Sequence, residues 1–65
     1  MKPKLTIDEY GTKEWKLPSG KHHREDGPAI EYASGYKEWY LNGNIYTESG
    51  HKYKIRSIKL KKLLQ

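Results

Sequence analysis

The chain has no cysteine and no phenylalanine, and its apolar residues never form a long run. The absence of cysteine excludes disulfides and zinc sites built on thiolates. No stretch approaches the roughly 20 apolar residues that a membrane-spanning helix needs, and the N-terminus lacks the apolar segment of a signal peptide. We therefore expect a cytoplasmic protein that makes no use of a membrane.

Apolar residues are also scarce for a chain of this length, at 34% of 65 residues. A chain of this size buries only about 60% of the surface that it exposes when unfolded. Two tryptophans and six tyrosines must therefore provide much of the packing, because each buries a large area and keeps a polar end. We expect one small domain that covers residues 1–65.

The stretch 27–47 predicts a three-stranded meander. Two short segments with alternating apolar residues, 29–32 and 37–41, are separated by the small residues of a tight turn. Asn42-Gly43 follows the second segment. An Asn-Gly pair between two strands is the strongest local signal for a hairpin, because its turn needs positive φ at both residues.

The chain also contains an internal repeat. Alternation predicts earlier strands over 4–10 and 13–17, and the Lys-Glu-Trp-x-Leu of the second recurs 24 residues later, at 37–41. Each unit is too small to bury its aromatic face alone, so the two units are expected to stack. The expected organisation is repeat unit one at about 11–34, repeat unit two at about 35–55, and a basic tail at 52–65.

The segments His-Arg-Glu-Asp-Gly-Pro-Ala at 23–29 and Lys-Glu-Trp-Tyr-Leu-Asn-Gly at 37–43 resemble the MORN-like repeats of many small bacteriophage and giant-virus proteins. The resemblance covers about residues 11–50, and the segment 46–52 departs from the pattern. It implies a mostly-β meander of two stacked hairpin units without catalytic residues. It also implies a phage accessory protein that binds and inhibits or redirects a host protein in the host cytoplasm.

The excess positive charge is confined to residues 52–62, which carry six bases and no acid, whereas the rest carries seven bases and eight acids. Alternation over 52–55 predicts a final strand with Tyr53 and Ile55 facing the sheet. Beyond it, leucines spaced three and four residues apart predict a short C-terminal helix. An extended basic tail is the alternative.

This tail has three interpretations. Its leucines suit the groove of a partner protein, with lysines at the rim; its bases suit the phosphates of nucleic acid; or it caps its own sheet. A protein partner is our first expectation and nucleic acid the alternative, while open sheet edges offer a route to self-association. The expected partner-binding residues are Tyr36, Tyr40, Lys54, Arg56, Lys59, Leu60, Lys61, Lys62, Leu63 and Leu64.

The aromatic residues are expected to divide between the core and the surface. Trp15 and Trp39 occupy equivalent repeat positions and are expected in the core. Tyr40 alternates with Trp39 and faces the other way. Tyr40 and Tyr36 therefore either contact a partner or pack on a second face.

The polar residues of the segment 22–26 predict no site for a metal or a cofactor. Adjacent His22 and His23 point to opposite faces of an extended segment. A pair between Arg24 and Glu25 or Asp26 is expected to be exposed and to stabilise little. The chain shows no catalytic constellation and no phosphate-binding loop, so we expect no enzyme activity.

Overall fold

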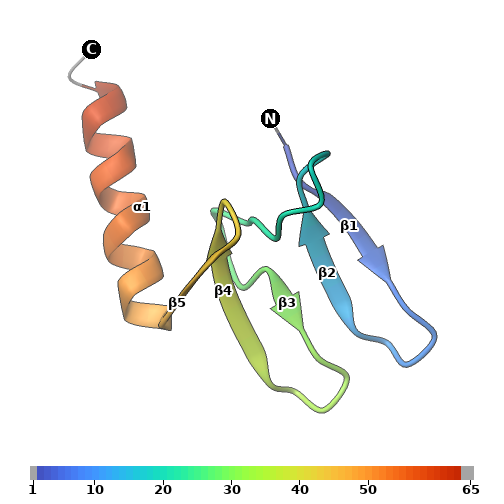
Figure 1. Ribbon diagram of the computed structural model, residues 1–65. Coiled ribbons are helices and arrows are strands. Elements are labelled where there is room, and N and C mark those ends of the chain that lie inside the picture. Colours follow the sequence, from blue (N-terminus) through green and yellow to red (C-terminus); the bar gives the residue numbers. More distant parts are fainter. Residues whose placement is uncertain (1, 64–65) are drawn as a thin grey trace.

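Five short strands in one antiparallel sheet and one C-terminal helix make up residues 2–63, which the computed structural model describes, the side chain of Leu63 excepted (Figure 1). The strands follow one another across the sheet in the order of the sequence. The expected mostly-β meander with a short helix is confirmed. The elements are β1 (Lys4–Ile7), β2 (Lys13–Lys16), β3 (Ile30–Glu31), β4 (Lys37–Leu41), β5 (Asn44–Tyr46) and α1 (Glu48–Leu63).

The turn between β4 and β5 has the geometry that its sequence demands. Asn42 has a φ of 52° and Gly43 a φ of 83°, as a two-residue hairpin turn with a positive φ at both positions requires. Leu41 pairs with Asn44 on either side of the turn. The three-stranded meander expected over 27–47 is confirmed as β3, β4 and β5.

The two repeat units begin with equivalent hairpins. Lys16, at the end of β2, forms an isolated bridge with His22. The positions 24 and 23 residues later are Tyr40 and Ile45, which pair between β4 and β5. The same backbone pairing thus occurs in each unit, although only the second builds a full strand from it.

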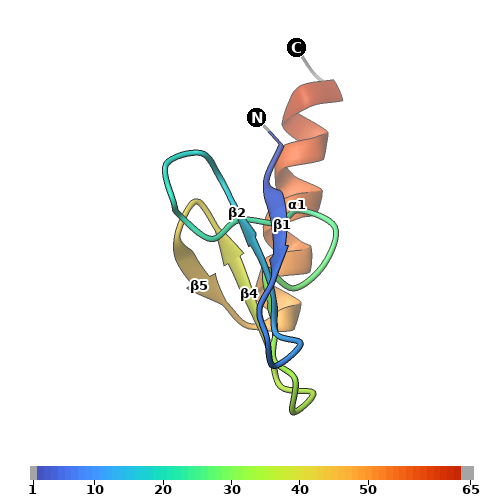
Figure 2. The same cartoon turned by 90° about the vertical axis from the view of Figure 1, so that its right-hand side faces the viewer.

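The sheet has two different faces. Register pairs Glu14 with Ile30 and Ile30 with Glu38, so these three residues share one face. Trp15 and Trp39 lie on the opposite face, which we call the tryptophan face. Figure 2, which views the molecule from the β1 side, shows α1 and the green part of the β2–β3 loop, nearest β3, on one side of the sheet, whereas the teal part, nearest β2, lies on the other side. Helix α1 packs against β4 and β5.

The buried core is small and includes two histidines. Its apolar members are Ala29, Ile30, Leu41 and Ile55, and its polar members are His23 and His51. Trp15 and Trp39, which were expected in the core, are only half-buried. Trp15 lies on β2, beyond the two strands that α1 contacts.

The final strand expected over 52–55 is wrong, because these residues belong to α1. Helical spacing places His51 and Ile55 one turn apart on the side that packs on the sheet, and both are buried. Tyr53 was expected to face the sheet, but its side chain is 77% exposed. Lys52, Tyr53 and Lys54 are all exposed on the helix, so the alternation in this segment does not separate two faces of a strand.

Helix α1 begins at a capping threonine. The Oγ1 of Thr47 accepts a hydrogen bond from the backbone N–H of Gly50 at 3.0 Å, as an N-cap residue does. The carbonyl of Thr47 accepts the N–H of His51 at 2.9 Å, the first helical hydrogen bond. No helix among residues 2–63 is long and apolar enough to cross a membrane.

Candidate functional site

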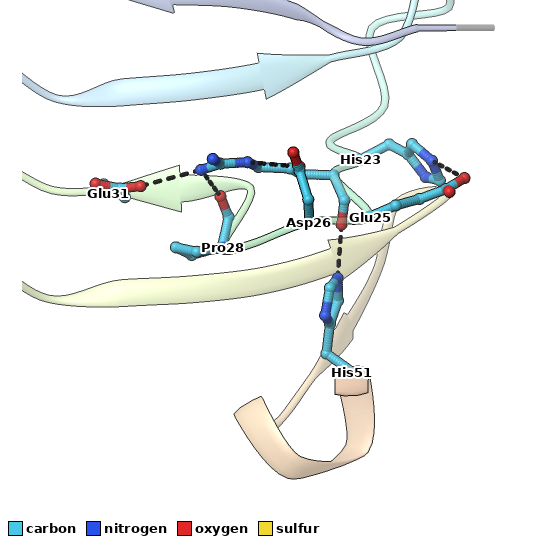
Figure 3. Close-up of polar contacts among 7 residues, drawn as sticks. His23, Glu25, Asp26, Pro28, Glu31 and His51 are labelled. Carbon is cyan, nitrogen blue, oxygen red and sulfur yellow. Dashed lines mark hydrogen bonds and ion pairs between the residues drawn. The ribbon is translucent and has the colours of Figure 1, made fainter. Parts of the chain in front are cut away.

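The loop between β2 and β3 is organised around the side chain of Arg24. Its guanidinium lies 3.8 Å from the ring centroid of Trp15. Its Nη1 donates to the carbonyl of Pro28 and to Glu31, both at 3.1 Å, and its Nε donates to Asp26 at 3.1 Å (Figure 3). The pair expected between Arg24 and Asp26 forms and is exposed on the Asp26 side, at 88%; the contacts of the guanidinium to Trp15, Pro28 and Glu31 were not expected. Stacking on the indole leaves this side chain 21% exposed and directs its donors to three acceptors at once.

Two buried histidines connect this loop to the rest of the fold. The Nε2 of His51, at the start of α1, donates to the carbonyl of Arg24 at 2.6 Å (Figure 3). The Nδ1 of His23 accepts the backbone N–H of Asn42 at 3.0 Å, and its Nε2 lies 3.4 Å from Glu25. A carbonyl only accepts and an N–H only donates, so these contacts fix the tautomer of both rings.

His22 lies away from this cluster. Its Nε2 is 2.8 Å from the carboxylate of Glu14, and its ring centroid is 5.2 Å from that of Tyr40. Both partners lie on the sheet face opposite the tryptophans. His22 and His23 thus diverge, as expected for neighbours in an extended segment. Within residues 2–63, no three metal-ligating side chains gather into a group that could hold an ion.

A cleft of about 430 Å³ lies between α1, the β2–β3 loop and β4. Its surface is mostly apolar. We call it the helix–loop cleft. The cleft is lined by Glu25, Asp26 and Gly27 from the loop, Trp39 from β4, and His51, Lys52, Ile55, Arg56, Lys59 and Leu60 from α1.

The two carboxylates that line the helix–loop cleft contact side chains of the protein itself. The hydrogen bond from Arg24 holds the pKa of Asp26 below its ordinary value, and a backbone hydrogen bond acts in the same direction. Glu25 lies 3.4 Å from the ring of His23. These contacts hold both carboxylates on the loop side of the cleft.

The basic wall of the cleft, formed by Lys52, Arg56 and Lys59 of α1, has fewer ionic partners within the described residues. Lys52 lies 3.7 Å from Glu48, one helical turn earlier, in an exposed pair. Arg56 and Lys59 form no ion pair with any side chain that the structure describes. The helix side of the cleft can therefore receive an external anion without losing an internal partner.

The predicted tail residues divide between the cleft and the open surface. Arg56, Lys59 and Leu60 line the helix–loop cleft. The three other lysines of the prediction are exposed on α1: Lys54, Lys61 and Lys62. The side chain of Leu63 and the whole of Leu64 lie outside the described residues.

The predicted tyrosines lie on the other face of the sheet. Tyr36 is 64% exposed, and its ring lies 5.7 Å from that of Tyr32. The hydroxyl of Tyr32 donates to Glu38 at 2.9 Å, which raises the pKa of Tyr32. Tyr40 is half-buried, and burial raises its pKa. The structure does not bring these tyrosines and the basic helix into one surface.

Sequence reasoning missed Trp39 and the loop carboxylates Glu25 and Asp26 as members of a site. Its one usable signal was the spacing of bases at Lys52, Arg56 and Lys59, which recur at intervals of four and three residues. That spacing predicts a basic edge on a helix. The loop carboxylates carry no such signal, because they meet α1 only in the folded chain.

Comparisons with models of protein families, with curated proteins and with solved structures found no match to this chain. The resemblance to MORN-like repeats stays a prediction that rests on the segments quoted above. The features of the molecule that bear on function are the surface chemistry of α1 and that of the helix–loop cleft.

Proposed function

We propose that the protein is a small non-enzymatic binding module that docks on a partner protein through the outward side of α1. The observation that supports this is the exposure of Tyr53 and Leu60, at 77% and 54%. These residues are seven positions apart, two helical turns, and so lie on one side of the helix. Their combined apolar surface is left uncovered by the protein's own sheet.

The surroundings of this pair match the way in which an amphipathic helix enters a groove. Lys54, Arg56 and Lys61 are exposed beside Tyr53 and Leu60. Burying a large apolar side chain contributes about 1.5–3 kcal/mol, and flanking charges steer encounter and set orientation. We therefore expect a partner with an apolar groove and an acidic rim.

The placement of α1 favours such docking. Figures 1 and 2 both show that its C-terminal half continues beyond the end of β4, so that only the first half lies against the sheet. Leu60 and Lys61 belong to this projecting half. A groove can approach it without displacing any strand.

Nucleic acid remains the alternative because of one observation. Helix α1 carries six bases and a single acid, Glu48, in residues 48–63. A helix of this charge neutralises phosphates, and such binding weakens steeply as salt rises. Partner binding through Tyr53 and Leu60 depends on apolar contact and responds less to salt.

Photo-crosslinking at two positions tests the proposal. A benzophenone amino acid replaces Lys54 on α1 or, as the control, Tyr36 on the opposite face of the sheet. In a nuclease-treated extract of the cells that make the protein, we expect one discrete protein adduct from position 54 and none from position 36. Circular dichroism of each variant checks that α1 is intact.

The same crosslinker at position 54 then tests how much Tyr53 and Leu60 contribute to docking. Adding Tyr53→Ser and Leu60→Ser removes two anchors, so we expect the adduct yield to fall by about tenfold or more. An undiminished yield would contradict docking through this side of α1. Adducts that form in an untreated extract but not in the nuclease-treated one would favour nucleic acid as the partner.

A further inference from the structure

We propose that the helix–loop cleft receives an apolar side chain of the partner, and that this side chain is flanked in the partner's sequence by carboxylates. The inference rests on the proposed function and deepens it, because it names the chemistry of the segment that the partner presents. The outward side of α1 and the cleft are different surfaces that share Arg56 and Leu60.

The size and apolar lining of the cleft suit one large apolar side chain. Its volume of about 430 Å³ falls within the roughly 300–1,000 Å³ that is typical of ligand sites. Trp39, Ile55 and Leu60 contribute apolar surface to its lining. A leucine or an aromatic side chain in this position covers the exposed part of the Trp39 indole, which the protein leaves half-buried.

The basic edge of the cleft determines the charge of the flanking residues. Lys52, Arg56 and Lys59 follow one another along the same side of α1, four and three residues apart. Arg56 and Lys59 have no ionic partner among the side chains of the described residues. A carboxylate can accept two parallel hydrogen bonds from a guanidinium, so Arg56 is the stronger of the two ligands.

The loop wall of the cleft favours a peptide over a nucleic acid strand. Glu25 and Asp26 of the loop line the cleft together with the bases of α1, and the hydrogen bond from Arg24 holds the pKa of Asp26 below its ordinary value. A phosphate chain has a charge at every nucleotide and meets repulsion along this wall. A peptide can direct its carboxylates towards α1 and leave a neutral backbone on the loop side.

The cleft is also preformed. Arg24 holds the loop by its stacking on Trp15 and its bond to Glu31, and His51 joins the carbonyl of Arg24 to the start of α1. Both walls are therefore positioned before a ligand arrives. Binding then loses little free energy to the ordering of the protein.

A short synthetic peptide with leucine between aspartate and glutamate residues is the probe. Titration followed by the indole N–H signals in an NMR spectrum reports on the two tryptophans separately. We expect the signal of Trp39 to shift and that of Trp15 to stay in place. Replacing the central leucine of the peptide by alanine should weaken binding by about tenfold, and replacing the acids by lysine should abolish binding.

Two matched double variants locate the charge requirement. Arg56→Gln with Lys59→Gln removes two charges at the cleft, and Lys54→Gln with Lys61→Gln removes two charges elsewhere on α1. We expect about tenfold weaker peptide binding for the first and less than about twofold for the second. Equal losses in the two variants would show a response to net charge alone and would overturn the proposal.

Further outcomes separate this proposal from the proposed function. Absence of any Trp39 shift with the acidic leucine peptide at millimolar concentration overturns the cleft proposal, as does a stronger shift with an oligothymidine. If the adduct from position 54 also survives the cleft double variant, docking through α1 stands without the cleft. If the peptide shifts Trp39 but no adduct forms from position 54, the cleft stands and docking through α1 fails.

Discussion

The two repeat units begin alike and end differently. Each has a Lys-Glu-Trp strand and a hairpin with equivalent backbone pairing. After the hairpin, the segments 24–29 and 47–52 correspond position by position and share a glutamate and a glycine. The first nevertheless becomes a loop that leads to β3, and the second becomes the start of α1.

The difference is concentrated at one repeat position, which Pro28 occupies in the first unit and His51 in the second. The N–H of His51 donates to the carbonyl of Thr47 and starts the helix. Pro28 has no N–H, so the equivalent carbonyl, that of Arg24, receives no such bond from its own unit. The ring of His51 donates to it instead. The helix of the second unit thus satisfies the acceptor that proline leaves free in the first.

This divergence creates the helix–loop cleft. Two stacked copies of one unit would place the same element twice against the sheet. Here the loop supplies an acidic wall and α1 supplies a basic wall on the same face. The candidate site is therefore a consequence of the difference between the units, and changes at equivalent positions test it.

The largest effect is expected from His51→Pro, which gives the second unit the residue of the first. The change removes the first helical hydrogen bond and the donor to the partly buried carbonyl of Arg24. A proline inside a helix costs about 3 kcal/mol or more, and an unsatisfied buried acceptor about 1–3 kcal/mol. We expect the variant to be largely unfolded, as measured by circular dichroism and urea denaturation.

Glu48→Pro is the matched control for that change. Glu48 is the first residue of α1, where the N–H has no helical acceptor and proline is well tolerated. The free energy of unfolding should change by no more than about 0.5 kcal/mol. Similar losses for the two prolines would show that the start of α1 does not depend on the hydrogen bonds of His51.

A smaller effect is expected at the position where the units carry Arg24 and Thr47. Arg24→Ala removes the stacking on Trp15 and the bond to Glu31, which should cost about 2 kcal/mol. Arg24→Lys keeps the charge but loses the planar fork, so about half of that loss should remain. Urea denaturation measures both variants.

Thr47→Ala gives the corresponding value for the second unit. It removes only the N-cap bond to Gly50, for which about 1 kcal/mol is typical. A loss in Thr47→Ala larger than the loss in Arg24→Ala would mean that the loop is held by contacts other than those of its arginine.

Local turn chemistry explains why β4, β5 and their turn were predictable. Asn42-Gly43 demands a positive φ at both positions, and the alternation around Trp39 requires no information from distant residues. The start of α1 was not predictable from alternation, because the Tyr53 region fits a strand as well as a helix. The decisive features were the Thr47 cap and the buried pair of His51 and Ile55, and burial depends on the folded sheet.

The candidate site was predictable only in its charge. The bases of α1 are evident in the sequence, and Arg56 and Lys59 do line the cleft. Trp39 was identified as a packing residue, but in the folded chain it is half-buried and lines the cleft. The function of Arg24 was missed because its stacking on Trp15 joins two segments that the sequence separates by a turn.

The smallest effect on stability is expected from Asp26→Asn, and this effect should depend on pH. The hydrogen bond from Arg24 lowers the pKa of Asp26, so the folded protein favours the carboxylate form. The resulting stabilisation is fully present above the ordinary pKa of 3.8. It is lost as the pH falls through the lowered pKa of the folded protein. Because Asp26 is 88% exposed, the variant should lose less than about 1 kcal/mol at neutral pH. That difference should vanish in stronger acid, as urea denaturation across the acid range would show. The equivalent residue of the second unit is Ser49, which does not titrate. The change in the free energy of unfolding caused by Ser49→Ala should therefore be the same at every pH. A pH-independent loss in Asp26→Asn would mean that the carboxylate does not hold the arginine of the loop.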